Sequence, residues 1–192
     1  MNRTEPLPLF VSLFLAIGLM GWISWSQRPV ESPVSTQAQP PVEVPGEPIG
    51  PEVDEVRVLE LRALADQAPR DSQVRTELGY IYFEAQSFGQ AIPWFEAALG
   101  LDPNNVSVST DLGVAYFYTD QIDRALDQFA RSLAVDPTHA KTLLDLGIVR
   151  ALGKQDLEGA IEAWEQVQQL DPDSAEALAA ADAIERIRSA HP

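Results

Sequence analysis

Side chains that commonly carry out catalysis or bind metals are scarce in this chain of 192 residues. It has no cysteine, and its two histidines, His139 and His191, stand far apart, each without a second imidazole at ligand spacing. A Gly-rich phosphate loop, a His-x-x-x-His pair and a Gly-x-Ser-x-Gly elbow do not occur. The sequence therefore predicts no catalytic residue, no metal site and no cofactor, and we expect a protein that is not an enzyme.

Carboxylates are abundant, with 29 Asp and Glu against 13 Lys and Arg and a formal net charge of -16. This excess makes nucleic acid an unfavourable partner. Glu77, Asp111 and Asp145 recur at a spacing of 34 residues. They predict a line of negative charge that could meet a basic partner, and the alternative interpretation is a solvated helix face.

The N-terminal part contains an uncharged apolar run, Leu7 to Trp25. As a helix it would be roughly 28 Å long, close to the hydrocarbon thickness of a membrane. After a short tail, residues 1–6, we therefore expect a transmembrane anchor at 7–25, and the alternative is a cleaved signal peptide. Arg3 and Arg28 flank the run. The very short tail favours a single-pass protein with its bulk outside the cytoplasm, and the alternative is a cytoplasmic domain. The membrane we expect is a bacterial inner membrane.

Prolines dominate the segment that follows, with seven between Pro29 and Pro51. Such a composition cannot build a packed core. Residues 26–51 are therefore predicted to be a disordered linker that spaces the next domain from the membrane.

The remainder of the chain has an internal period. Pro69, Pro103 and Pro137 are 34 residues apart, and Pro172 follows after 35. Gly79, Gly113 and Gly147 are also 34 apart, and each follows a leucine. Two residue types with one period predict a helical repeat array.

Apolar spacing of three and four residues predicts two helices in each repeat. A glycine in the middle of the first helix costs about 1 kcal/mol relative to alanine, which is consistent with close approach of a neighbouring helix. The small and bulky positions recur in register. They are Leu78, Gly79, Tyr82, Ala91, Phe95 and Pro103, then Leu112, Gly113, Tyr116, Ala125, Phe129 and Pro137, then Leu146, Gly147, Ala160, Trp164 and Pro172.

This pattern resembles the tetratricopeptide repeat (TPR), which implies an all-α superhelix. The resemblance covers residues 72–105, 106–139 and 140–174 as three hairpins. Flanking helices are expected at 52–71 and 175–192, so that eight helices follow the linker. The third block departs from the pattern, because Arg150 replaces the tyrosine and one extra residue precedes Ala160.

In the family, ligands lie against the first helix of each hairpin, on the concave surface. The resemblance therefore implies a groove for a protein or peptide client, with Tyr80, Phe83, Phe117 and Tyr118 as anchors; the alternative is that these rings are packing residues. We expect that replacing Tyr80, Phe83 and Phe117 together by alanine abolishes capture without unfolding. The groove positions are Gln73, Thr76, Tyr80, Phe83, Ser107, Thr110, Val114, Phe117, Tyr118, Lys141, Leu144, Ile148 and Leu152.

The lysine and asparagine clamp of chaperone-binding family members is absent, because Thr76, Tyr80 and Asp111 stand at the corresponding places and Lys141 alone remains. The plan of the chain, one span followed by repeats, also loosely resembles the TPR subunits of bacterial cytochrome c maturation. That likeness implies an anchored scaffold of a multiprotein membrane complex, acting in assembly or maturation of envelope proteins such as c-type cytochromes. The alternative is a structural protein that self-associates or spaces a membrane complex and binds no free peptide.

Overall fold

The structure is a computed structural model, and it describes residues 52–190. The predicted tail, anchor and linker at 1–6, 7–25 and 26–51 lie outside this range. Within it, none of the helices combines the length and the apolar character that crossing a membrane requires.

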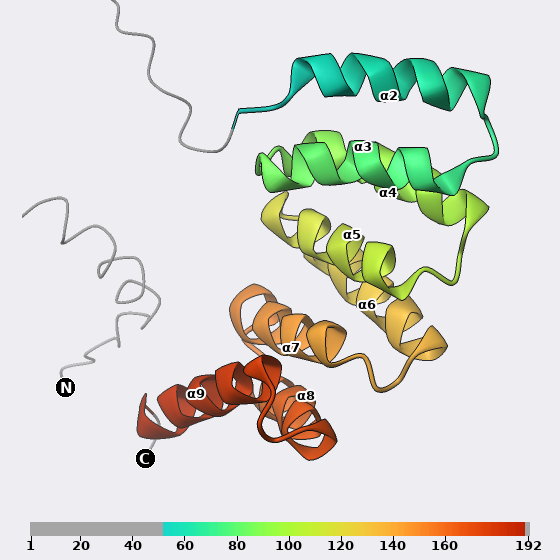
Figure 1. Cartoon of the computed structure of the whole chain (residues 1–192). Helices are drawn as coiled ribbons and strands as arrows, with labels where there is room; N and C mark the ends of the chain where they lie inside the picture. Colours follow the sequence, from blue (N-terminus) through green and yellow to red (C-terminus); the bar gives the residue numbers. More distant parts are fainter. Residues whose placement is uncertain (1–51, 191–192) are drawn as a thin grey trace, which may run out of the picture. The chain divides into compact units, whose positions relative to one another are not determined.

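Eight α-helices follow one another in the described range, which contains no strand, and the predicted all-α fold is confirmed (Figure 1). They are α2 (Glu55–Gln67), α3 (Ser72–Glu84), α4 (Phe88–Leu101), α5 (Val106–Tyr118), α6 (Ile122–Val135), α7 (Ala140–Val149), α8 (Leu157–Leu170) and α9 (Ala175–Ala190). A π-helical turn, η1 (Arg150–Lys154), continues α7.

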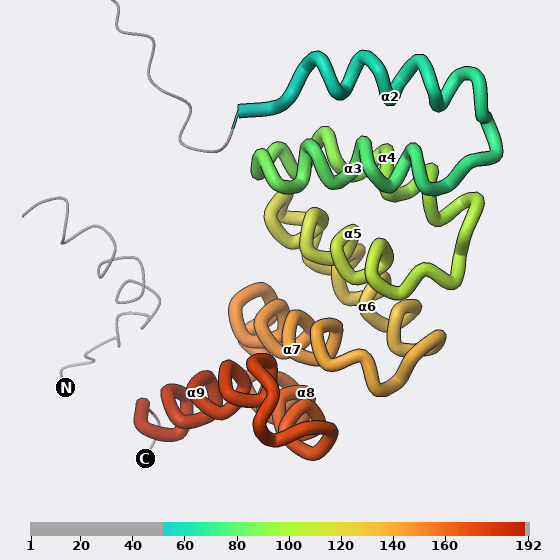
Figure 2. Tube along the Cα trace, in the orientation of Figure 1, coloured from blue at the N-terminus to red at the C-terminus, as the bar shows by residue number. Residues whose placement is uncertain are grey.

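The helices pair into three antiparallel hairpins, α3 with α4, α5 with α6 and α7 with α8. Helix α2 packs on α3 at one end of this array, and α9 packs on α8 and α7 at the other. The trace in Figure 2 shows the hairpins stacked in chain order. This is the predicted arrangement of three hairpins with a flanking helix at each end.

The glycine of each first helix lies against the bulky residue of the second. Gly79 faces Phe95, Gly113 faces Phe129, and Gly147 faces the indole of Trp164. At each glycine an added Cβ would lie less than 3.0 Å from the facing ring. The glycine period therefore records the close approach of two helices, as the sequence predicted.

The first helices of the hairpins share a capping position that sequence analysis did not identify. The side chains of Asp71, Asn105 and His139 each accept a hydrogen bond from a backbone N–H in the first turn of α3, α5 and α7. These residues are also 34 apart. Aspartate and asparagine satisfy free N–H groups at helix starts, so the signal was readable at two of the three positions.

The turns inside the hairpins each contain one residue with positive φ, namely Gln86, Asp120 and Gln155. In the first two hairpins the next backbone N–H donates to a carbonyl five residues back, from Ser87 to Tyr82 and from Gln121 to Tyr116. In the third it reaches six residues back, from Asp156 to Arg150. The extra residue is thus accommodated as the π-helical turn, and the Arg150 side chain donates to the Gly159 carbonyl at 2.9 Å.

Polar side chains interrupt the core between the second and third hairpins. The hydroxyls of Thr110, Ser132 and Thr142 are buried and lie 2.6 to 3.2 Å apart. Thr110 is 0 % exposed, so the prediction that it lines the groove is wrong. Its side chain lies in the contact of α5 with α6 and α7, where buried hydroxyls must find hydrogen-bond partners.

Candidate protein-binding face

The first helices of the hairpins, α3, α5 and α7, follow one another along one side of the array, with α4, α6 and α8 along the other (Figure 1). We call the exposed surface of α3, α5 and α7 the A-helix face. Positions 34 residues apart lie side by side on it and form rows across the helices. Curved repeat arrays use such extended surfaces for binding.

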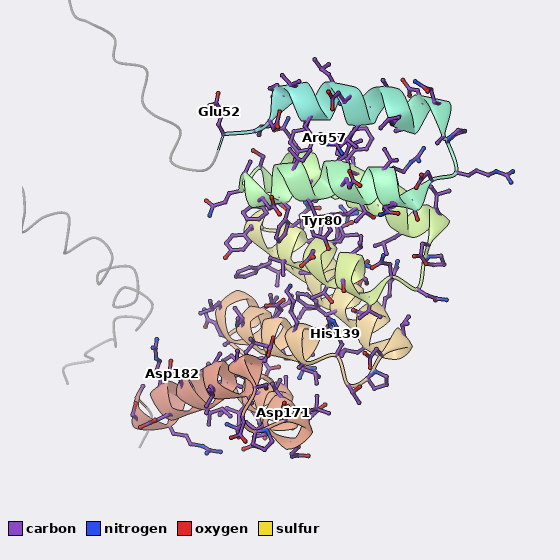
Figure 3. All side chains as sticks on the ribbon, viewed as in Figure 1. Glu52, Arg57, Tyr80, His139, Asp171 and Asp182 are labelled. Carbon is purple, nitrogen blue, oxygen red and sulfur yellow. The ribbon has the colours of Figure 1, made fainter. Side chains whose placement is uncertain are left out.

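One half of the A-helix face, toward the helix N-termini, is polar. Arg57 of α2 donates to Glu77 of α3 at 3.0 Å, and the Tyr80 hydroxyl donates to Asp111 of α5 at 2.9 Å. Lys141 of α7 donates to Asp111 at 2.8 Å and to Asp145 at 3.1 Å. Figure 3 labels Arg57 and Tyr80, which begin this series of contacts between successive helices.

These contacts change the interpretation of the acidic line. Glu77, Asp111 and Asp145 hold the predicted positions, but each carboxylate is engaged by a cation, and Asp111 is buried as well. Lys141 is likewise paired with two carboxylates, so its charge is already balanced within the array. Sequence analysis missed Arg57 because it lies on the flanking helix, outside the repeated blocks.

The ionisation of this cluster follows from its burial. Desolvation raises the pKa of Asp145, and the neighbouring Lys141 only partly opposes it. Desolvation alone would lower the pKa of Lys141, but the charges of Asp145 and Asp111 outweigh it and the pKa is raised. Burial, followed by the charge of Asp111, raises the pKa of Tyr80. The cluster therefore holds its protons at Tyr80 and Lys141 more tightly than free side chains would.

The other half of the A-helix face, toward the helix C-termini, is apolar. Tyr80, Val114 and Ile148 form one row and are half-buried. In the neighbouring row Tyr118 is 62 % exposed and Leu152 is 47 % exposed. These two residues are the large apolar side chains of the predicted groove that are open to solvent. A contiguous apolar strip of this kind on a repeat surface is suited to contact with another polypeptide.

Six aromatic rings form a connected series beside this strip. Tyr80 and Phe83 pack against Phe95, Phe83 contacts Phe88, Phe88 stacks on Tyr118 at 4.4 Å, and Tyr118 meets Phe117. The first of these rings thus contribute to the core, as the alternative interpretation expected. Tyr118 is the ring that a partner can reach most easily.

The remaining predicted groove residues have different environments. Gln73, Ser107 and Lys141 are exposed near the start of their helices, and Thr76, Phe83, Phe117 and Leu144 are half-buried. The Leu144 carbonyl accepts a hydrogen bond from the indole of Trp164 at 3.0 Å. Between residues 52 and 190, no group of three or more His, Asp or Glu side chains is placed to hold a metal ion.

Stacked helical hairpins with an exposed apolar strip on the A-helix face are typical of helical-repeat interaction proteins. Residues 82–146 match the family described as Tetratricopeptide repeat. Solved TPR structures share this fold, and together with the matched residues they support a tetratricopeptide-repeat protein. A search of curated proteins gave no match.

Three of the similar solved structures illustrate the likeness. The first TPR of Spaghetti (RPAP3) bound to the HSP90 peptide SRMEEVD is 26% identical, with a TM-score of 0.56 over 62% of this chain and 91% of that one. The first TPR domain of human RPAP3 is 26% identical, with a TM-score of 0.57 over 64% and 93%. MamA is 19% identical, with a TM-score of 0.58 over 69% and 85%, and shows the fold alone.

Proposed function

We propose that this chain is a membrane-anchored scaffold that holds a client polypeptide against the A-helix face. The observation that carries the proposal is the apolar strip with Tyr118 and Leu152 open to solvent beside half-buried Val114 and Ile148. Side chains this large and exposed favour a partner that removes them from water.

The client differs in chemistry from the peptide held by the similar domain of Spaghetti. That peptide, SRMEEVD, ends in acidic residues. Here Lys141 is already bound by Asp111 and Asp145, and both carboxylates would repel an acidic chain end. The A-helix face therefore suits a client segment that is apolar and not acidic.

The uncharged run at 7–25 supports membrane anchoring, with the repeats outside the cytoplasm of a bacterial cell. Assembly or maturation of envelope proteins is the process we propose for the scaffold. The loose resemblance to cytochrome c maturation subunits makes c-type apocytochromes the first client class to test.

Site-specific photocrosslinking tests the proposal. A photoreactive phenylalanine analogue at Tyr118 probes the A-helix face, and the same analogue at Val56, which is 70 % exposed on α2, is the matched control. We expect one defined client crosslinked from position 118 and absent from position 56. Leu152→Ala should weaken that crosslink without unfolding the array. Equal crosslinking from both positions, or none from 118, would contradict the proposal.

A second candidate function is self-association without a free peptide ligand. Val56 and Leu59 on the outer surface of α2 are 70 % and 66 % exposed, and they favour this candidate. It predicts crosslinked dimers from position 56 and a concentration-dependent increase in size. The same experiment therefore separates the two candidates.

A further inference from the structure

A hollow of about 460 Å³ lies between the start of α8 and the last turns of α9. Its apolar wall is formed by Leu157, Ile161 and Ile187. Glu158, Glu162, Glu165 and Arg188 surround its opening. We call it the α8–α9 pocket. It is separate from the groove positions predicted on α3, α5 and α7.

The repeat register shows what occupies the equivalent places earlier in the array. Phe88, Ile122 and Leu157 form one series, in which the successive spacings are 34 and 35 residues. Tyr118, Leu152 and Ile187 form a second series with the same spacings. The three places are thus copies of one structural position, where the start of a second helix meets the end of the next first helix.

In the two earlier copies, residues of the chain itself lie against one another at this position. In the first, the rings of Phe88 and Tyr118 stack with centroids 4.4 Å apart and planes 9° from parallel. In the second, Ile122 lies so near Gly153 that a Cβ there would be 2.8 Å from its Cγ2. The third copy, like the second, has two aliphatic side chains where the first has stacked rings. In this copy a hollow remains, and its apolar wall is half-exposed.

The opening of the pocket carries a net negative charge. Arg188 pairs with Glu165 at 2.9 Å. Across residues 52–190, none of the ion pairs includes Glu158 or Glu162, and both side chains are exposed. Three carboxylates therefore stand against one guanidinium around an apolar wall. Positive groups on either side of an apolar side chain would complement this arrangement.

We propose that the α8–α9 pocket binds one aromatic side chain of a partner polypeptide, with lysine or arginine residues on both sides of it. The ring takes the place that stacked rings fill in the first copy and packs on Leu157, Ile161 and Ile187. The basic neighbours contact Glu158 and Glu162. The site adds a second contact to the array, and it does not depend on what the A-helix face binds.

Methyl NMR of the full-length chain in nanodiscs of zwitterionic phosphatidylcholine tests this pocket. The probe is the capped peptide GGKKFKKGG, compared with GGEEFEEGG and GGKKAKKGG. We expect the first peptide to shift the δ1 methyl signals of Ile161 and Ile187 saturably, and the other two to bind at least about tenfold more weakly. Equal binding of the three peptides, or unchanged signals at both isoleucines, would overturn the proposal.

Two variants with matched controls locate the binding. Leu157→Phe combined with Ile187→Tyr reproduces the ring pair of the first copy, and the Ile161 signal should then no longer respond. Glu162→Lys changes only the charge at the opening of the pocket, and it should weaken binding of GGKKFKKGG by about tenfold. This test remains available even if the variant that combines Leu157→Phe with Ile187→Tyr fails to fold. Asp127→Lys, one repeat earlier at the equivalent exposed position of α6, should leave binding unchanged. Equal weakening by both lysine variants would show a general charge effect and overturn the assignment.

Discussion

Gly113 of α5 lies directly against the ring of Phe129 of α6, and an added Cβ would be no more than 3.0 Å from three carbons of that ring. Phe129 is 0 % exposed and belongs to the packed core. The glycine is therefore required by the distance between the two helices of the hairpin. Its helical φ shows that no unusual backbone conformation is involved.

Gly113→Ala should consequently lower the free energy of unfolding by about 1–3 kcal/mol, because overpacking outweighs the gain in helix propensity of up to about 1 kcal/mol. Urea unfolding followed by far-ultraviolet circular dichroism measures the change. Gly100→Ala is the matched control, since a Cβ there meets nothing within 4 Å and should leave stability unchanged or raise it. A stabilising effect of Gly113→Ala would mean that Phe129 can move aside.

The fold could be predicted because the residues that pack paired helices together and the residues that end helices recur with the same period. Gly79, Gly113 and Gly147 mark the contacts between paired helices, and Pro69, Pro103 and Pro137 mark the starts of the next hairpins. Each pattern involves residues of one repeat, and the same pattern recurs in the next repeats. Local patterns of this kind are sufficient to specify an array whose units contact only their neighbours.

The candidate site was less predictable, because its residues depend on contacts between repeats. Thr110 has the spacing of a groove residue but reaches a hydroxyl of the next hairpin, Thr142, and is buried there. The 34-residue spacing of Glu77 predicted that it belongs to an unpaired line of negative charge. In the structure it is paired with Arg57, which lies outside the repeats. Helical spacing gives the side of one helix on which a residue lies, and it does not give the partner on the next helix.

The hairpin turns offer a stabilising substitution. Gln86 has a φ of 55°, a left-handed conformation that costs a residue with a Cβ roughly 1–2 kcal/mol and glycine very little. Gln86→Gly should therefore raise the free energy of unfolding by about 1 kcal/mol. The melting temperature reports the change. Gln90→Gly, four residues later inside α4, is the control and should lower stability by about 1 kcal/mol, because glycine is a poor helix former.

The ion cluster on the A-helix face predicts a coupling between Lys141 and Asp145. Lys141→Ala leaves the carboxylates of Asp111 and Asp145 without their shared cation, and should lower the free energy of unfolding by about 1 kcal/mol. Asp145→Asn removes one of the two carboxylates and should recover part of that loss. A double-mutant cycle by urea unfolding measures the coupling. Strictly additive effects would show that the pair contributes nothing beyond its members.

Alkaline pH should destabilise the array through three protonated groups. Burial and the nearby Asp111 raise the pKa of Tyr80, burial and the hydrogen bond to Glu96 raise that of Tyr116, and the charges of Asp145 and Asp111 raise that of Lys141 despite its desolvation. Above the ordinary pKa values of 10.0 for tyrosine and 10.5 for lysine, the folded state therefore binds more protons than the unfolded state. Because the folded state binds more protons, the free energy of unfolding should fall as pH rises through this range.

Two measurements check this pH dependence. The free energy of unfolding should decline above pH 10.0, and the decline should be shallower in Tyr80→Phe and in Tyr116→Phe, because each substitution removes one group that releases its proton on unfolding. Tyrosinate absorbance gives the second measurement: in the folded protein part of the signal from the four tyrosines should appear only at higher pH than in concentrated urea. Identical absorbance titrations in the two states would show that Tyr80 and Tyr116 exchange protons freely with solvent, and the burial of their hydroxyls between helices would then be wrong.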